Sequence, residues 1–235
     1  MCLGIGLTRS TKLFYYIRNI FHFIYTDKGM GKLASIELSG KVSDITYGLG
    51  GLSLGRPYNA ASFSASTNNK FAYTLGDTSH PSDLGVADTK SSKRLTAVND
   101  DLFSFKKLGK VEEMWWESSY DQRKIQGWVV TPPDFDPSKK YPMILEIHGG
   151  PFTSYGAVYS AEIQAYAAEG YVVLYTNPRG STSYGEEFGN LIHHDYPNHD
   201  YEDLMSGVDA LLEKGYVDED NLFVTGGSGG GVLTA

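Results

Sequence analysis

The hydrophobic and polar positions of this chain form two successive patterns. From about residue 25 to 110, short apolar runs alternate with turns rich in Gly, Ser, Asn, Asp and Pro. This pattern predicts strands at residues 33–38, 71–75 and 84–88, followed by a stretch at 93–96. Short strands with a turn every ~8–12 residues are typical of β-sandwiches and of β-propeller blades. A propeller has about four blades or more, so this part would supply about two of them.

From about residue 111 the pattern changes to apolar strands that alternate with amphipathic helices. Strands are expected at residues 111–117, 124–131, 143–147, 171–175 and 221–225. The first two would form an antiparallel pair that turns at residues 119–121. Helices are expected at residues 159–169 and 201–214, and Gly170 and Gly215 would end them. The second helix carries one apolar face, made by Leu204, Val208, Leu211 and Leu212.

Strands separated by helices of about 10–15 residues imply a parallel sheet. We therefore predict an α/β fold with a mostly parallel sheet and flanking helices for residues 111–235. Residues 1–110 would form an all-β, partial propeller-like domain, in which residues 1–25 are left unassigned. In sheets of this kind, ligands bind beyond the carboxyl ends of the strands.

The first 25 residues mix Arg9, Lys12 and Arg18 with apolar and aromatic side chains. The uncharged stretch at 13–17 is too short for the core of a signal peptide, and a membrane span needs about 20 apolar residues. We therefore expect no signal peptide and no membrane span. A targeting segment and a start that is not the natural N-terminus both stay open, as does the choice between cytoplasm and periplasm.

The last predicted strand runs into Gly226-Gly227-Ser228-Gly229-Gly230, which matches G-x-S-x-G. The nucleophile elbow of α/β-hydrolases has this order: a strand, a sharp turn that carries the serine, and then a helix. The turn strains the serine backbone, so residues two positions away must be small, and here all four neighbours are glycine. Residues 232–235 would begin a buried helix, whose N-terminus favours negative charge. Ser228 is thus the candidate nucleophile, and the N–H of Gly229 would face a developing oxyanion. A flexible glycine-rich turn is the alternative.

The same pattern occurs a second time at residues 51–55, around Ser53. A poor strand precedes this match, and Arg56-Pro57 follows it. Because proline disfavours a helical conformation in the residue before it, no elbow helix is expected there. We interpret Ser53 as a loop serine.

A second motif, His148-Gly149-Gly150-Pro151, follows the strand predicted at 143–147. A histidine-glycine-glycine turn after an early sheet strand supplies the other half of a hydrolase oxyanion hole. Both this motif and Ser228 stand at the carboxyl ends of predicted parallel strands, so they would open on one crevice. His148 itself is expected to orient the turn and not to act as the catalytic base.

Composition limits the remaining possibilities. The net charge is −8 and the basic residues are scattered, so nucleic acid is not an expected partner. Cys2 is the only cysteine, which excludes an internal disulfide and a cysteine-based metal site. His193, His194, Asp195 and His199 lie close in sequence, but their spacing fits no standard metal motif, and a solvated loop is expected. We predict no metal, no cofactor and no membrane partner, and the oligomeric state is not readable.

Five ordered motifs together resemble the prolyl oligopeptidase family of serine peptidases, with the acylaminoacyl-peptidase and dipeptidyl-peptidase branch fitting best. They lie at residues 148–151, 177–181, 184–185, 200–204 and 226–230. The resemblance covers residues 111–235, and more weakly residues 30–110 as closing blades of that family's propeller. It implies an enzyme that cleaves short peptides, with the propeller acting as a size filter.

The resemblance also implies roles for particular residues. Ser228 would be the nucleophile, and Gly150 and Gly229 would donate backbone N–H groups to the oxyanion. Asp203 and Arg179 match motif positions, where we expect structural roles as a helix-start charge and a loop anchor. The strand position of Glu112-Glu113 excludes it as the family's acidic anchor for a substrate amino terminus.

In the α/β-hydrolase order, the acid and the histidine of the triad follow the serine. They are therefore expected beyond residue 235, and the 235-residue chain is expected to be nearly inactive alone. The strand before Ser228 would form an open apolar sheet edge that is prone to association. Two alternatives stay open: an esterase or lipase on the same fold, and a non-catalytic binding fragment.

Overall fold

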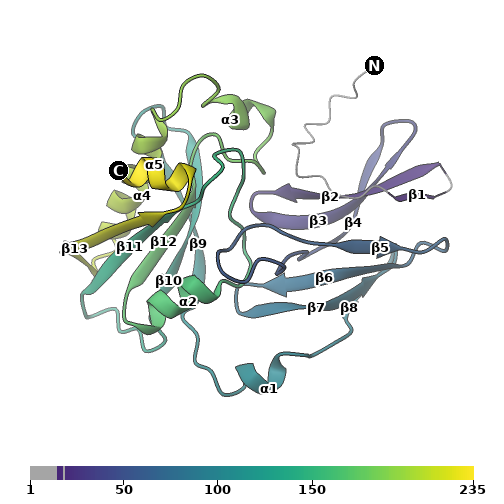
Figure 1. Ribbon diagram of the computed structural model, residues 1–235, viewed down its shortest axis with the longest axis horizontal. Coiled ribbons are helices and arrows are strands. Elements are labelled where there is room, and N and C mark those ends of the chain that lie inside the picture. The colour runs from purple at the N-terminus through teal and green to yellow at the C-terminus, as the bar shows by residue number, and fades with distance from the viewer. Residues whose placement is uncertain (1–14, 18) are drawn as a thin grey trace. The chain divides into compact units, whose positions relative to one another are not determined.

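The computed structural model describes residues 15–17 and 19–235, and for residues 15–17 it describes the backbone alone. The expectations for the first 14 residues concern positions outside this description. The described chain divides into two compact units (Figure 1). The first comprises the residues up to Lys106 together with Gly156–Ser160, and the second comprises Lys107–Tyr155 and Ala161–Ala235.

The first unit is built from two four-stranded antiparallel sheets, each with its strands in sequence order. The first sheet contains β1 (Tyr15–Ile17), β2 (Ile20–Asp27), β3 (Met30–Glu37) and β4 (Val42–Tyr47). The second contains β5 (Phe63–Ala65), β6 (Phe71–Asp77), β7 (His80–Ala87) and β8 (Ser92–Arg94), and the short helix α1 (Asp100–Phe103) follows it. The strands predicted at 33–38, 71–75 and 84–88 are confirmed as parts of β3, β6 and β7.

Turn chemistry explains the two central hairpins. Between β2 and β3, Lys28 and Gly29 have φ angles of 50° and 74°. Two positive φ angles in a two-residue loop match the right-handed twist of the paired strands. Between β6 and β7, the Asp77 carboxylate accepts the Ser79 backbone N–H at 2.7 Å, a local bond that favours a turn. The strands then pack apolar side chains into a core that contains Leu33, Leu49, Phe63, Phe71, Tyr73 and Ala87, and Phe23, Ala34 and Ile36 form a second cluster.

The second unit contains a five-stranded sheet with the order β13-β11-β12-β10-β9. Its strands are β9 (Lys110–Glu117), β10 (Lys124–Thr131), β11 (Tyr141–Ile147), β12 (Val172–Asn177) and β13 (Val217–Gly226). β11 runs parallel to both β12 and β13, whereas β10 is antiparallel to β9 and to β12. The prediction of a mostly parallel sheet was therefore too strong. The β9–β10 hairpin reverses the chain direction, which makes the sheet mixed.

Helices lie on both faces of this sheet (Figure 1). The second unit contains the helices α2 (Ala161–Ala168), α3 (Glu186–Asn190), α4 (Asp200–Leu212) and α5 (Gly229–Thr234). Gly170 and Gly215 follow α2 and α4 with φ angles of 93° and 83°, as predicted for glycines that end helices. None of the helices in the described residues has the length and hydropathy needed to cross a bilayer.

The predicted helix at 159–169 begins later than expected, because residues 156–160 pack with the first unit. There the Gly156 N–H donates to the Pro57 carbonyl at 2.8 Å, and the Ser160 hydroxyl donates to the Gly55 carbonyl at 2.5 Å. The predicted apolar face of α4 is confirmed, since Leu204, Val208 and Leu211 are buried. They join the main core of the second unit with strand residues such as Val172 and Leu174.

Candidate active site

The two candidate motifs follow neighbouring strands. β11 and β13 are parallel and paired, and the last pair in their register is Ile147 with Gly226. The residues that come next, beginning with His148 and Gly227, therefore leave the same edge of the sheet. This edge is the carboxyl end of the parallel strands, where open α/β sheets bind their ligands.

Ser228 lies between β13 and α5 with φ 56° and ψ −116°, a strained conformation for a residue with a side chain. Two backbone hydrogen bonds close the turn around it: the Gly230 N–H donates to the Gly227 carbonyl at 3.0 Å, and the Val232 N–H donates to the Ser228 carbonyl at 3.1 Å. The serine side chain is exposed and makes no cap hydrogen bond to α5. Strand, strained serine and helix follow one another as the motif predicted.

The requirement for small neighbours is visible in the packing of the elbow. A Cβ atom at Gly230 would lie 2.1 Å from the Ile147 carbonyl oxygen, and one at Gly226 would lie 2.6 Å from the Gly230 backbone. These are the two residues that stand two positions from the serine. The start of α5 is therefore packed directly on the ends of β11 and β13. The expectation that α5 is buried holds only for its first two residues, because Val232 is exposed.

The glycine turn after β11 lies beside the elbow. A Cβ atom at Gly149 would lie 3.1 Å from the Ser228 Cβ atom. A Cβ atom at Gly229 would lie 3.4 Å from the Gly150 backbone nitrogen. The Gly150 and Gly229 backbones thus lie close to each other beside the serine. Two N–H groups that converge beside a nucleophile can stabilise an oxyanion.

His148 is a buried residue at the base of this turn. Its Nδ1 atom lies 2.8 Å from the Gly149 carbonyl oxygen, so this nitrogen carries the proton, and its Nε2 atom lies 2.8 Å from the Ser181 Oγ atom. Both ring nitrogens thus contact groups other than Ser228. Burial lowers the pKa of His148 to about 4, because it disfavours the charged imidazolium. The geometry fits the predicted orienting role.

Arg179 and Asp203 form a buried ion pair at the end of β12. The guanidinium donates from Nη2 to Asp203 Oδ1 at 2.7 Å and from Nε to Asp203 Oδ2 at 2.9 Å. Arg179 also contacts Asp121 at 3.1 Å, and its guanidinium lies 5.0 Å from the ring centre of Tyr120. The loop after β12 is therefore anchored to the first turn of α4, where the sequence analysis expected an anchor and a helix-start charge.

The other candidates of the sequence lie apart from this arrangement. The Ser53 hydroxyl donates to the Arg56 carbonyl at 2.8 Å in a loop of the first unit, as expected for a loop serine. His193 and His194 lie in an exposed turn. The ring of His199 stacks on Tyr120, with 3.4 Å between the ring centres.

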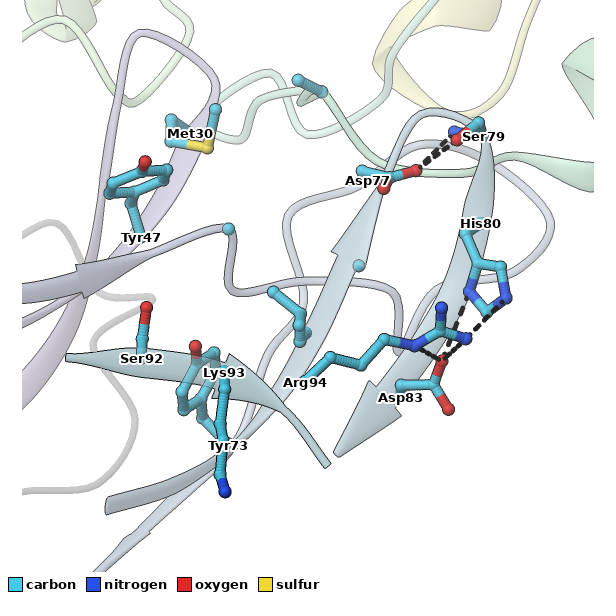
Figure 2. A pocket seen from close by; sticks show the side chains of 14 residues that line it. Met30, Tyr47, Tyr73, Asp77, Ser79, His80, Asp83, Ser92, Lys93 and Arg94 are labelled. Atoms are coloured by element: carbon cyan, nitrogen blue, oxygen red, sulfur yellow. Dashed lines mark hydrogen bonds and ion pairs between the residues drawn. The ribbon is translucent and has the colours of Figure 1, made fainter. Parts of the chain in front are cut away.

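A cavity of about 560 Å³ lies in the first unit (Figure 2). At one side of it, His80 and Arg94 point from β7 and β8 toward Asp83. Among the described residues, His80, Asp83 and Asp100 form the one group whose ligand atoms are close enough to hold a metal ion. Arg94 already occupies this position, because its Nε atom donates to Asp83 at 2.6 Å and its Nη2 atom contacts both carboxylates. The cluster therefore ties α1 to the second sheet and does not suit a cation.

Sequence reasoning missed two residues that touch the candidate site. Ser181 contacts His148, and Tyr196 donates its hydroxyl to the Gly229 carbonyl at 2.7 Å. Ser181 belongs to the motif at 177–181, but nothing in the motif indicated its partner. Tyr196 stands in a polar loop between α3 and α4, where the only signal was an aromatic residue among charged and polar neighbours.

Comparisons with known proteins found a family, sequence relatives and solved structures to which this chain is similar. Residues 157–235 match the prolyl oligopeptidase family. A Bacillus subtilis protein named uncharacterized peptidase YuxL is 36% identical over 217 residues, covering 91% of this chain and 32% of that protein. A probable dipeptidyl-peptidase 5 of Aspergillus terreus is 38% identical over 128 residues, covering 52% of this chain and 17% of that protein.

The fold is also similar to that of a solved structure, an acylaminoacyl peptidase of Pyrococcus horikoshii. The two match with a TM-score of 0.81 and 24% identity, covering 95% of this chain and 34% of the other. The chain thus spans 17% to 34% of the length of these relatives. The motif resemblance and the sequence matches point to the same family, since residues 157–235 match the prolyl oligopeptidase family, and the solved structure shows that the fold is shared.

Proposed function

We propose that this chain supplies the nucleophile and the oxyanion hole of a serine peptidase that hydrolyses short peptides. One observation carries the proposal. Ser228 has a strained backbone, with a φ angle of 56°, and the glycine turn that follows the adjacent strand lies beside it. The names of two relatives support the proposal, because one is called a peptidase and the other a probable dipeptidyl-peptidase.

The proposed chemistry is acyl transfer. The Ser228 hydroxyl attacks a peptide carbonyl while a histidine takes its proton, and a tetrahedral intermediate forms. The N–H groups of Gly150 and Gly229 hold its oxyanion. The leaving amine takes the proton from the histidine, and water then hydrolyses the acyl-enzyme. His148 is not the proposed base, because both of its ring nitrogens contact other groups. In this fold the histidine follows the serine along the chain.

The role of the glycine turn follows from the energies involved. A donor that faces the oxyanion acts in the transition state, and removing one typically costs about 3–4 kcal/mol of barrier lowering. A donor contributes this much only if its direction is fixed before the reaction. Here His148 fixes the Gly149 carbonyl from one side, and the close packing of Gly230 on Ile147 fixes α5 from the other.

For the first unit, we propose that its two four-stranded sheets are blades of a β-propeller that limits the size of the substrate. The support is the topology, since each sheet pairs its strands in sequence order and runs antiparallel throughout. Four-stranded sheets of this kind are the repeating unit of propellers.

The test uses protein expressed from the complete reading frame that contains this chain. Ser228→Ala should abolish labelling by a fluorophosphonate probe and hydrolysis of aminoacyl anilides. Ser53→Ala is the matched control, because Ser53 stands in the other G-x-S-x-G sequence, and it should retain both. Labelling that survives Ser228→Ala, or that is lost with Ser53→Ala, would contradict the proposal.

A substrate panel separates the candidate activities. Hydrolysis of a nitrophenyl ester without any aminoacyl anilide would favour an esterase over a peptidase. Among anilides, an N-acylated amino acid and a free dipeptide distinguish an acylaminoacyl peptidase from a dipeptidyl peptidase. Binding of peptides that survives Ser228→Ala while hydrolysis is lost would support catalysis by this serine.

A further inference from the structure

Within the loop between α3 and α4, Tyr196 turns inward from an otherwise exposed stretch at residues 193–198. His193, His194 and Asp195 are exposed, and so is Pro197, whereas Tyr196 between them is half-buried. Its hydroxyl donates to the Gly229 carbonyl at 2.7 Å. The two residues are 33 positions apart in sequence, so this contact ties a surface loop to the first residue of α5.

The Tyr196 hydroxyl and the Gly150 backbone nitrogen both lie near one point beside Gly229. A Cβ atom at Gly229 would lie 3.1 Å from this hydroxyl and 3.4 Å from the Gly150 backbone nitrogen. The hydroxyl thus packs against the Gly229 backbone on the side that faces Gly150. A side chain at position 229 would displace it, which gives a reason for glycine there.

The start of α5 needs an external support of this kind. Its first three residues are glycines, which have no side chains to pack and which lose the most conformational freedom on folding. Hydrogen bonds within the elbow fix the carbonyls of Gly227 and Ser228. The bond from Tyr196 adds a fixed point at the next carbonyl, that of Gly229.

The tyrosine loop is itself held in place by α4. The buried carboxyl group of Asp200 accepts the Asn198 backbone N–H at 2.6 Å, and the Asn198 side chain donates to Asp195 at 2.8 Å. These bonds flank Tyr196 and hold the segment of the loop that carries it. Burial raises the pKa of Tyr196, and the charge of Asp200 raises it further, so the hydroxyl stays protonated at neutral pH and keeps its donor.

From these contacts we infer that Tyr196 is a positioning residue of the oxyanion hole, an inference that rests on the proposed function. Its hydroxyl holds the Gly229 carbonyl, and through it the orientation of the first turn of α5, so that the Gly229 N–H faces the oxyanion. The hydroxyl does not contact the substrate. Its loss therefore slows acylation without changing substrate binding.

The kinetic test compares Tyr196→Phe with the parent, both expressed from the complete reading frame. The variant removes one oxygen atom and keeps the ring. We expect kcat to fall about fivefold to tenfold, the effect of one ordinary hydrogen bond, with KM unchanged. Tyr201→Phe is the matched control, since this exposed tyrosine lies on the outer surface of α4, and its kcat should equal that of the parent.

A second measurement does not depend on activity. Hydrogen exchange, followed by mass spectrometry of peptides from residues 224–235, reports the amides of Gly230 and Val232 that close the elbow. Tyr196→Phe should speed their exchange at least about fivefold, and Tyr201→Phe should not.

The outcomes separate this inference from the proposed function. Unchanged exchange overturns the inference, even if kcat falls, because the hydroxyl would then act directly on substrate. Faster exchange with unchanged kcat overturns it as well. If Ser228→Ala keeps its activity, the proposed function fails by that result alone, whatever Tyr196→Phe does. A fall in kcat at constant KM together with faster exchange supports the inference.

Discussion

Arg179 and Asp203 form a two-pronged ion pair that is closed to solvent, with side-chain exposures of 4% and 0%. One oxygen of the carboxylate also accepts the Arg179 backbone N–H at 2.8 Å, so the aspartate holds both the side chain and the main chain of the loop after β12. This loop leaves the carboxyl edge of the sheet, the edge at which the Ser228 elbow also lies. The pair therefore fixes part of the frame around the candidate site.

Asp203→Asn should destabilise the fold by up to about 3–5 kcal/mol, because it removes the buried charge that faces the Arg179 guanidinium and leaves it only the half-buried carboxylate of Asp121. The measurement is the free energy of urea unfolding of the 235-residue chain at pH 7. Glu117→Gln is the matched control: Glu117 pairs with Lys124 at 2.9 Å, but both side chains are more than half exposed. An exposed pair contributes at most about 1 kcal/mol. Equal losses in the two variants would contradict the structural role of the buried pair.

The glycines of α5 should differ in their tolerance of a methyl group. Gly230→Ala should destabilise the chain by about 1–3 kcal/mol or more, because the new Cβ would lie 2.1 Å from the Ile147 carbonyl oxygen. Gly231→Ala places a Cβ 3.5 Å from its nearest neighbour, an ordinary contact, and alanine favours the helix by about 0.5–1 kcal/mol. Unfolding midpoints in urea that shift in the same direction for both variants would refute the close packing of the elbow.

Local patterns predicted most of the second unit because they depend on residues near each other in sequence. The strands, the two helix-ending glycines and the elbow at Ser228 all follow from period, turn residues and glycine spacing. The start of α2 was misplaced because Ser160 bonds the Gly55 carbonyl, a partner 105 residues away. Such a contact leaves no trace in the local composition, and it overrode the helical pattern.

The residues of the candidate site likewise fall into those that the local sequence predicted and those that depend on distant partners. Ser228, Gly150 and Gly229 were predicted because the backbone turns in which they lie require short sequence motifs that can be recognised. The roles of Tyr196 and Ser181 were not, because each acts through a distant partner. A lone tyrosine in a polar loop has many possible partners, and only the folded chain brings Gly229, 33 residues later, within its reach. Arg179 and Asp203 were each given a structural role, but their pairing needed the register of the fold.

His148 makes stability depend on pH. Its pKa is about 4 in the folded state, against about 6.5 when it is unfolded. Below pH 6.5 the unfolded chain therefore binds a proton that the folded chain does not, and stability falls as the pH is lowered toward 4. The expected loss between pH 7.5 and pH 5 is about 2 kcal/mol, measured by urea unfolding at both values.

The contribution of His148 is isolated by comparing how the free energy of unfolding changes with pH in the parent and in variants. In His148→Gln this part of the pH dependence should disappear, although the variant is less stable at pH 7.5 because it loses the bonds to Gly149 and Ser181. His193→Gln is the control at an exposed position, and its pH dependence should match that of the parent. A His148→Gln variant that loses as much stability on acidification as the parent would show that other groups carry the effect.

The edge of the second sheet should drive association of the 235-residue chain. In the described structure, β13 pairs with β11 on one side, and its residues Leu222, Phe223 and Val224 are 40%, 50% and 44% exposed. An apolar edge strand with unpaired backbone groups is a template for another strand. We therefore expect the chain to elute as dimers and larger species by size-exclusion chromatography with light scattering.

Charged residues introduced at the sheet edge test whether β13 is the surface through which the chains associate. Leu222→Lys combined with Val224→Lys should shift the chain toward monomer, because lysines at a strand edge repel a second copy and stay solvated. Phe105→Lys is the control, since Phe105 is 86% exposed but lies outside any strand, and it should leave the association unchanged. If Phe105→Lys yields the monomer and the β13 variant does not, then association depends on exposed apolar area elsewhere. If the parent is already a sharp monomer peak, the edge is protected in solution.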